Sequence, residues 1–145
     1  MVGDTAYEIA LMSAKFSFEV DPEHDLVRIK MAGFFRQADV AAFLEARRVA
    51  HAQLRCPPNA HLTLNDLRGM DMQPHDIVDA FREVLAAPEY RSRRLAFVVG
   101  NTWSRSQAIR AIERREARWF DDPAKAEAWL FAEELAEMPL RRAFG

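Results

Sequence analysis

The chain has 145 residues, half of them apolar and 29% charged, which is the profile of one folded globular domain. Its formal net charge of −2 provides no overall field that favours nucleic acid or a membrane surface, and a single cysteine, Cys56, excludes an internal disulfide. The amino end lacks the basic leader of a signal peptide, and no stretch approaches the roughly 20 apolar residues of a membrane span. We therefore expect a cytoplasmic protein without a transmembrane segment.

Two alternating segments begin the predicted fold. In residues 15–20 (KFSFEV) and 26–33 (LVRIKMAG) apolar side chains recur at every second position, and residues 21–25 are typical of a turn. These segments predict an antiparallel hairpin with one polar face. Residues 37–54 predict a helix, because apolar residues recur there at helical spacing. The inward residues of this helix are expected to be Val40, Phe43, Leu44, Ala50 and Leu54.

The middle of the chain predicts two more strands and a helix. HLTLNDL (61–67) alternates, which predicts a strand that ends near Leu67 and has Leu62 and Leu64 facing inward. Residues 74–86 carry a single apolar stripe, which predicts a helix. RLAFVVG (94–100) is nearly all apolar, as is typical of a central strand buried on both faces.

The last third of the chain predicts a helix, a strand and a helix. SRSQ (104–107) forms a capping box, which predicts a short helix, and EARWF (116–120) predicts a fifth strand. Asp122 and Pro123 are typical of the N-cap and first position of a helix. The inward residues of this last helix are expected to be Ala126, Trp129 and Leu130.

Strands that alternate with helices predict a single α/β domain. We expect a mixed, mostly parallel sheet of five strands, with an antiparallel hairpin at its amino end and about four helices. We further expect residues 1–14 to be an N-terminal extension, residues 15–138 to form the domain and residues 139–145 to be a C-terminal tail.

Several of these segments together resemble the SpoIIAA-like proteins, which share the STAS fold of sulphate transporters and anti-sigma factor antagonists. They are the opening hairpin, the strand ending in LNDL, the strand RLAFVVG and the closing EARWFDDPAKAEAWL. The resemblance extends from Phe16 to about Glu133, and its motifs are structural rather than catalytic. It implies a SpoIIAA-like fold and, from the best-known members, a bacterial regulator that binds another protein.

In those regulators, a serine or threonine near the start of the helix after the third strand is phosphorylated, and the added charge switches binding to a kinase partner. The matching stretch here, LNDLRGMDMQPHD (64–76), contains no serine, threonine or tyrosine. The phosphorylation switch is therefore not expected. Two interpretations remain: Asp66 and Asp71 present a permanent negative charge, or the stretch is a polar cap without a switching role.

The candidate site residues follow two of the predicted strands. Asp66, Arg68 and Asp71 follow the third, and Trp103 and Arg105 follow the fourth, at the carboxyl ends where open α/β sheets bind ligands. Two carboxylates with an arginine suit acid–base work or the orientation of a polar group. The simpler interpretation is a capped turn and a helix dipole. Trp103 is interpreted equally well as an interface anchor or as a lid over the core.

Motifs for other chemistry are absent from the sequence. The four histidines are not at metal-ligand spacing, and there is no Walker loop, GxGxxG fingerprint or nucleophile elbow. Arginines gather between residues 91 and 118, but no aromatic residues alternate with them as stacking platforms for nucleic acid. We therefore expect no metal, no cofactor and no nucleic-acid partner.

Three functions remain. The favoured one is a non-enzymatic, cytoplasmic regulatory module that binds a protein through Asp66, Arg68, Asp71, Trp103 and Arg105. The alternative is a carrier of a small molecule or lipid, whose phenylalanine-rich interior opens a pocket beneath a helix, by analogy with lipid-binding domains of similar fold. The second alternative is a hydrolase-like enzyme that uses Asp66 and Asp71 as an acid–base pair. A homodimer is compatible with each of them.

Overall fold

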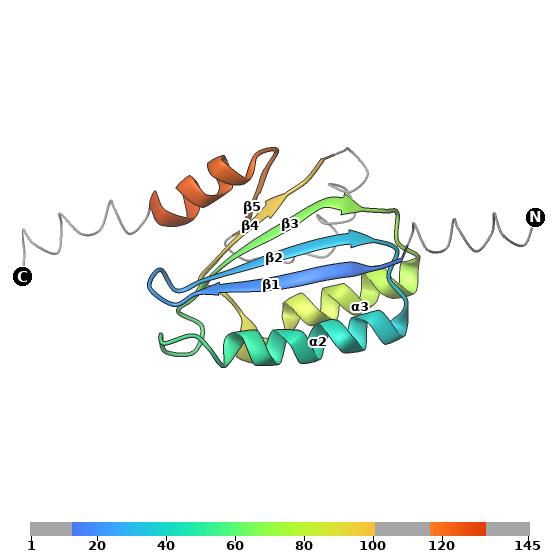
Figure 1. The fold of residues 1–145 in the computed structure, drawn as a ribbon, viewed down its shortest axis with the longest axis horizontal. Coiled ribbons are helices and arrows are strands. Elements are labelled where there is room, and N and C mark those ends of the chain that lie inside the picture. Colours follow the sequence, from blue (N-terminus) through green and yellow to red (C-terminus); the bar gives the residue numbers. More distant parts are fainter. Residues whose placement is uncertain (1–12, 101–116, 133–145) are drawn as a thin grey trace, which may run out of the picture.

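The fold is built around one twisted sheet of five strands, with helices on both sides of it (Figure 1). The computed structural model describes residues 13–100 and 117–132. The predicted helix after Ser104, residues 1–12 of the predicted N-terminal extension and the predicted tail lie outside this part of the chain. The elements are β1 (Lys15–Asp21), β2 (Leu26–Gly33), α2 (Gln37–His51), β3 (Leu62–Met70), α3 (His75–Ala86), the 3-10 helix η1 (Pro88–Tyr90), β4 (Arg94–Val98), β5 (Ala117–Phe120) and a helix over residues 123–132.

The strand order in the sheet follows the chain, β1-β2-β3-β4-β5. β1 and β2 pair antiparallel, whereas β2 with β3, β3 with β4 and β4 with β5 pair parallel. A parallel pair needs a crossover: α2 connects β2 to β3 and α3 connects β3 to β4, both on the lower side of the sheet, while residues 123–132 cover part of the upper side (Figure 1). The predicted mixed, mostly parallel sheet with an antiparallel hairpin is confirmed.

The helix over residues 123–132 closes the upper core. Its Ala126 and Leu130 are fully buried and pack against apolar residues of β2, β3 and β4, Leu62 among them. The helix begins as predicted, because the Asp122 Oδ1 atom accepts a hydrogen bond from the backbone N of Ala124 at 2.9 Å.

The lower core, between the sheet and the two long helices, is dominated by aromatic rings. Phe16 and Phe18 of β1 lie beside Phe43 of α2, and Phe35 and Phe43 both contact Phe81 of α3. Their ring centroids are 5.0 to 6.3 Å apart, which is the spacing of packed aromatic pairs. These rings fill the space beneath the hairpin with side chains.

One inward residue of α2 was predicted wrongly. Leu44 is 37% exposed, and α2 ends at His51, short of Leu54. Arg47 is buried instead, at 9% exposure, on the same side as Val40, Phe43 and Ala50. It can lie there because its Nη1 donates to the backbone oxygen of Val84 at 2.8 Å, so part of its charge is compensated while its aliphatic stem packs in the core.

The third strand is longer than predicted. It runs to Met70, so Arg68 and Gly69 belong to the strand and not to a loop. The extension exists because β2 continues beside it: Ala32 pairs with Gly69 and Gly33 with Met70, after a register shift between Lys30 and Ala32. A Cβ atom at Gly69 would lie 2.8 Å from the Cβ of Ala32, so this close approach requires glycine.

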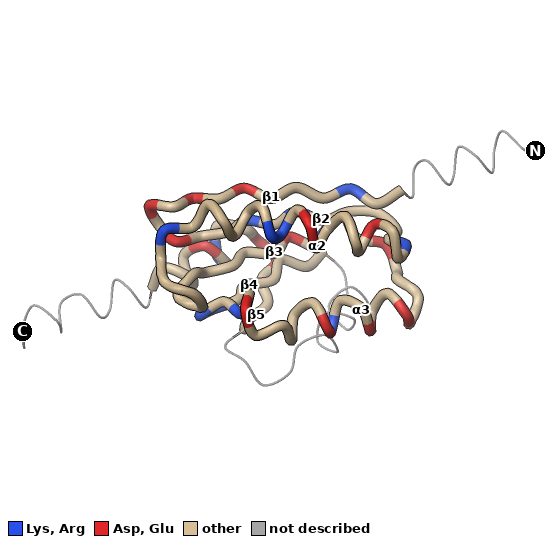
Figure 2. The backbone as a smooth tube through the Cα atoms, turned by 90° about the horizontal axis from the view of Figure 1, so that it is seen from below, with Lys and Arg blue, Asp and Glu red and all other residues tan. Residues whose placement is uncertain are grey.

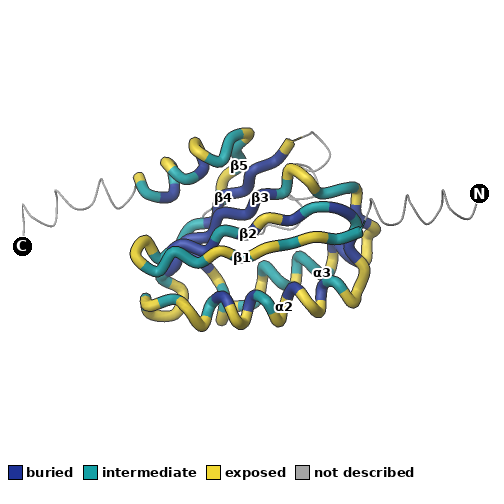
Figure 3. The backbone as a smooth tube through the Cα atoms, viewed as in Figure 1, coloured by how far each residue is buried: buried dark blue, intermediate teal, exposed yellow. Residues whose placement is uncertain are grey.

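Both faces of β3 are buried. Leu62 and Leu64 face the upper core, as predicted, but the alternate residues His61, Thr63 and Asn65 are buried as well. Together these three residues form a polar row on the side of the sheet that α2 and α3 cover. The row is covered because β3 lies at the centre of the sheet, with helices above and below it. Figure 3 shows the contrast with β1, whose residues alternate between exposed and half-buried.

Within residues 13–100 and 117–132, no helix is both long enough and apolar enough to cross a bilayer.

Candidate functional site

Asp66 and Arg68 form an ion pair at the carboxyl end of β3. Arg68 donates from Nε to Asp66 Oδ1 at 3.0 Å and from Nη2 to Oδ2 at 2.8 Å, and its backbone N adds a bond to Oδ1 at 3.1 Å. Asp66 is 8% exposed, whereas the Arg68 side chain reaches solvent. The arginine therefore holds the buried carboxylate and presents the remaining donors of its guanidinium outward.

This pair keeps the Asp66 carboxyl ionised. Burial raises its pKa, but the hydrogen bonds from the Arg68 side chain and backbone, with the charges of Arg68 and Lys30, outweigh burial and leave the pKa below its ordinary value. A general acid needs a raised pKa. The pairing therefore favours a structural or recognition role for Asp66 over acid–base work.

A buried glutamine links the loop after β2 to the loop after β3. Gln73 Oε1 accepts from the backbone N of Phe35 at 2.9 Å, and its Nε2 donates to the backbone oxygens of Gly33 and Asp71 at 2.9 and 2.6 Å. The backbone N of Asp71 also donates to the Gly33 oxygen at 3.1 Å. Asp71 is thus fixed through its backbone, next to the residues that lead into α3. The sequence reasoning missed Gln73, because nothing in its local pattern identifies its distant partners.

Met72, between Asp71 and Gln73, points into solvent. It is 65% exposed, more than Leu44 or Val49, which are the other exposed large apolar residues of the described chain. Asp66, Arg68, Asp71 and Met72 all belong to the segment from the end of β3 to the start of α3. We call these four residues the β3-end surface.

The neighbouring strand approaches the β3-end surface. β3 and β4 pair in parallel, with Asp66 opposite Val98, which places the ends of both strands at one edge of the sheet. A Cβ atom at Gly100 would lie 3.6 Å from the Cβ of Arg68, so the chain leaves β4 beside the arginine. Trp103 and Arg105, the other two predicted site residues, lie outside the described residues.

A second cluster, at the opposite end of the parallel strands, was missed from sequence. His51 of α2 and His61, which precedes β3, meet with their Nε2 atoms 3.2 Å apart. Tyr90 lies against His51 at a ring-centroid distance of 5.0 Å, and the Arg47 guanidinium lies 4.1 Å above the centre of the same tyrosine ring. The only available signal was the position of Arg47 on the apolar stripe of α2.

The hydrogen bonds assign the tautomers of this histidine pair. The His51 Nδ1 atom lies 2.9 Å from the backbone oxygen of Arg47, and because a carbonyl only accepts, Nδ1 carries the proton. In the neutral ring, His51 Nε2 is then an acceptor, and His61 Nε2 donates to it. Burial lowers the pKa of His51; the hydrogen bond to Arg47 opposes this shift and the charge of Arg47 adds to it.

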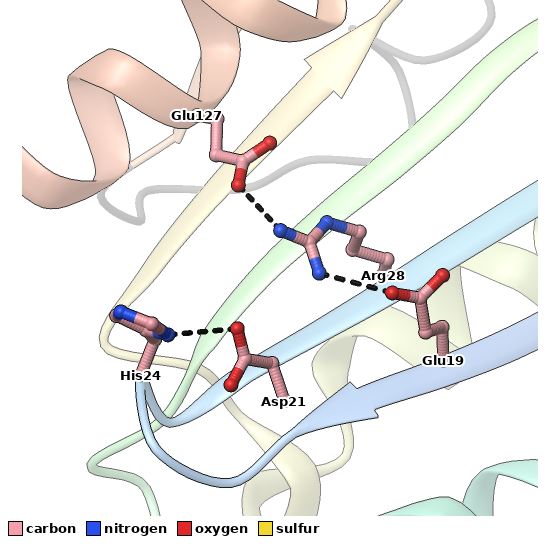
Figure 4. Close-up of polar contacts among 5 residues, drawn as sticks. All are labelled: Glu19, Asp21, His24, Arg28 and Glu127. Atoms are coloured by element: carbon pink, nitrogen blue, oxygen red, sulfur yellow. Dashed lines mark hydrogen bonds and ion pairs between the residues drawn. The ribbon is translucent and has the colours of Figure 1, made fainter.

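A third polar cluster ties the hairpin to the last helix (Figure 4). Arg28 of β2 donates to Glu19 of β1 at 3.2 Å and also to Glu127 of the helix over residues 123–132. In the hairpin turn, His24 Nδ1 lies 2.8 Å from Asp21 Oδ2, and the His24 ring contacts Phe131. The hydrogen bond from His24 lowers the pKa of Asp21. These contacts connect β1, β2 and the last helix, and each of the five side chains drawn has a polar partner.

The described residues contain no group of three or more histidine, cysteine or acidic side chains that could hold a metal ion. Burial and the nearby Asp25 carboxylate raise the pKa of the Cys56 thiol, which disfavours the reactive thiolate. Viewed from below, acidic and basic residues are interspersed along α2 and α3 (Figure 2), with Arg48 bonded to Glu45 and Arg82 to Asp79. Residues of both charges therefore occur along these two described helices.

No family model matches the sequence, and no curated protein matches it. Among solved structures, an uncharacterized protein with a SpoIIAA-like fold from Shewanella loihica matches 81% of this chain and 94% of its own, with a TM-score of 0.61 and 13% identity. An anti-sigma factor antagonist from Mycobacterium paratuberculosis matches the same shares of the two chains, with a TM-score of 0.56 and 12% identity. The chain therefore has a SpoIIAA-like fold.

Proposed function

We propose that this chain is a non-enzymatic, cytoplasmic regulatory module that binds another protein through its β3-end surface. The observation that carries the proposal is the exposure of Met72, at 65%, beside the outward-facing guanidinium of Arg68. Protein interfaces are enriched in methionine and arginine. Exposure of a large apolar side chain to water is unfavourable, and burial against a partner would remove that cost. The predicted Trp103 and Arg105 would extend the same surface from the end of β4.

The β3-end surface is suited to recognition because its backbone and the Arg68 side chain are preorganised by hydrogen bonds. Gln73 ties the backbone of Asp71 to that of Gly33, and Arg68 is oriented by two hydrogen bonds from its guanidinium to Asp66. Side chains that are already ordered lose less conformational entropy on binding. The SpoIIAA-like fold, shared with a protein named as an anti-sigma factor antagonist, supports a protein as the partner.

Binding would not be switched by phosphorylation at the position used by the best-known relatives. Residues 64–76 contain no hydroxyl group that could accept a phosphate. We infer that the permanent charges of Asp66, Arg68 and Asp71 set the affinity, so the control of this module would be through its abundance or its partner. The enzyme alternative is weaker, because the Asp66 carboxylate is committed to Arg68.

The proposal predicts that Met72→Glu and Asp71→Lys each reduce recovery of a specific partner at least tenfold, because they change an exposed and a half-buried residue of the β3-end surface. The measurement is quantitative mass spectrometry of proteins retained by the immobilised full chain from a lysate of the cell that encodes it. Arg105→Glu tests the predicted extension of the surface in the same way.

The matched control is Val49→Glu on α2, where Val49 is 47% exposed and lies away from the β3-end surface. It introduces the same charge at another exposed apolar position and should leave partner recovery unchanged. The same set of retained proteins for wild type, Met72→Glu and Asp71→Lys would refute the proposal, provided that each variant has a wild-type circular dichroism spectrum.

A further inference from the structure

β1 is an edge strand whose side chains are complementary to a second copy of itself. Within the described residues it pairs with β2 alone, over its whole length from Lys15 opposite Ala32 to Asp21 opposite Leu26. This pairing has no register shift. Proteins protect an edge strand with bulges, prolines or short length, because unpaired backbone groups accept another strand. β1 has seven residues, no bulge and no internal proline.

The side chains of β1 define one antiparallel register for self-pairing. If Phe18 of each copy lies on a two-fold axis, Lys15 of one copy stands opposite Asp21 of the other, and this pair occurs twice. Ser17 stands opposite Glu19, and Phe16 opposite Val20. In antiparallel pairs, directly opposed side chains are close enough to interact, so the opposite charges at the two ends of β1 stabilise this register. A parallel pairing would instead oppose lysine to lysine.

The same register would cover apolar surface. Phe16, Phe18 and Val20 are only half-buried although they contact the aromatic cluster of the lower core. Because the two-fold axis is perpendicular to the sheet, these residues of both copies lie on the same lower side. A second copy would therefore continue the sheet and shield the outer sides of the phenylalanine rings.

We propose that the protein forms a homodimer in which two β1 strands pair antiparallel about Phe18 and join two five-stranded sheets into one. Asp21 can take part because its Oδ2 is bonded to His24, so the lysine of a second copy approaches the other carboxylate oxygen. The β3-end surface lies two strands away from β1, level with its Lys15 end, so the dimer presents that surface twice.

The test is the mass of the full chain measured by sedimentation equilibrium over a range of protein concentrations at low salt. We expect a species of twice 16.6 kDa. Lys15→Asp and Asp21→Lys should each weaken dimerisation about tenfold, because each places two like-charged pairs across the axis. The double variant Lys15→Asp/Asp21→Lys should restore it, since the charges are exchanged within every pair.

The matched control is Lys30→Asp, an exposed lysine on β2, one strand away from the proposed interface, and it should leave the dissociation constant unchanged. A chain that stays monomeric at every concentration would overturn the proposal. So would a dimer whose dissociation constant is the same in both single charge variants as in wild type.

A second measurement tests the register without depending on the charges. In a Cys56→Ser background, the double variant Ser17→Cys/Glu19→Cys places cysteines of the two copies opposite each other. We expect a disulfide-linked dimer after mild oxidation, while Ser17→Cys alone should remain uncrosslinked. Efficient crosslinking of Ser17→Cys alone would instead place the axis at Ser17 and overturn the proposed register.

Discussion

At the scale of single residues, two charged side chains inside the fold have partners that compensate their burial, whereas the Oδ1 atom of buried Asn65 has no hydrogen-bond partner among the described residues. Arg68 compensates Asp66 with a two-point ion pair, and Val84 accepts a hydrogen bond from buried Arg47. The sequence predicted Asp66 and Arg68 as candidate site residues at the end of the third strand, and the structure places both within β3. The sequence could not predict that His51 meets His61, because that contact depends on how α2 packs against the sheet.

The histidine pair makes stability depend on pH. The folded pKa of His51 lies below its unfolded value of 6.5, so the unfolded chain binds the proton more tightly. The stabilising contribution is fully present above pH 6.5 and is lost as the pH falls toward the folded pKa. We therefore expect the Tm, measured by differential scanning calorimetry, to fall between pH 7.5 and pH 5. His51→Gln, which can still bond to His61, should show a smaller fall.

The matched control for this change is His75→Gln, at the exposed start of α3. It should reproduce the wild-type dependence of Tm on pH. An identical fall in wild type and His51→Gln would mean that His51 does not contribute. The Asp66–Arg68 ion pair does not contribute to this fall between pH 7.5 and pH 5. The pKa of Asp66 is lowered from 3.8, so its carboxylate becomes protonated only below that pH.

At the scale of elements, the close approach of β2 and β3 decides where the candidate site lies. The sequence predicted both strands, but it placed the end of β3 near Leu67, because the glycine at position 69 is typical of a turn. In the fold, Gly69 instead lets β3 continue beside Ala32 to Met70. The site residues Asp66 and Arg68 are consequently held by a sheet rather than by a loop.

Gly69→Ala is expected to destabilise the protein by about 1–3 kcal/mol, because the new Cβ would lie 2.8 Å from the Cβ of Ala32 and force the strands apart. Urea unfolding followed by circular dichroism measures the change. Adding Ala32→Gly removes the opposing methyl group and should recover part of the loss. If the double variant is no more stable than the sum of both single changes predicts, strand contact is not the cause.

At the scale of the whole molecule, the two sides of the sheet are covered differently. Two long helices cover the lower side, whereas on the upper side the helix over residues 123–132 lies over part of the sheet and Lys15, Ser17 and Glu19 of β1 are exposed (Figure 1). On the upper side, Leu130 of this helix is among the largest residues that are fully buried. The Arg28–Glu127 ion pair adds a link between this helix and the hairpin.

Leu130→Ala is expected to lower the free energy of unfolding by about 2–5 kcal/mol, since it leaves a cavity between the last helix and the sheet. The check is the midpoint of urea unfolding at constant slope. Ala128→Gly, at an exposed position of the same helix, controls for helix propensity and should cost about 1 kcal/mol. A loss for Leu130→Ala no larger than that of the control would show that the helix contributes little to the core.

The sequence by itself determined the elements that depend on local pattern. Alternation in β1 and β2, the apolar run of β4 and the Asp122–Pro123 helix start are properties of neighbouring residues, and all of them are found in the fold. The order of the strands, the burial of both faces of β3, the Gln73 clamp and the meeting of His51 with His61 were decided only by tertiary structure. The physical reason is that these features join residues distant in the chain, and their energies arise only once the helices have packed on the sheet.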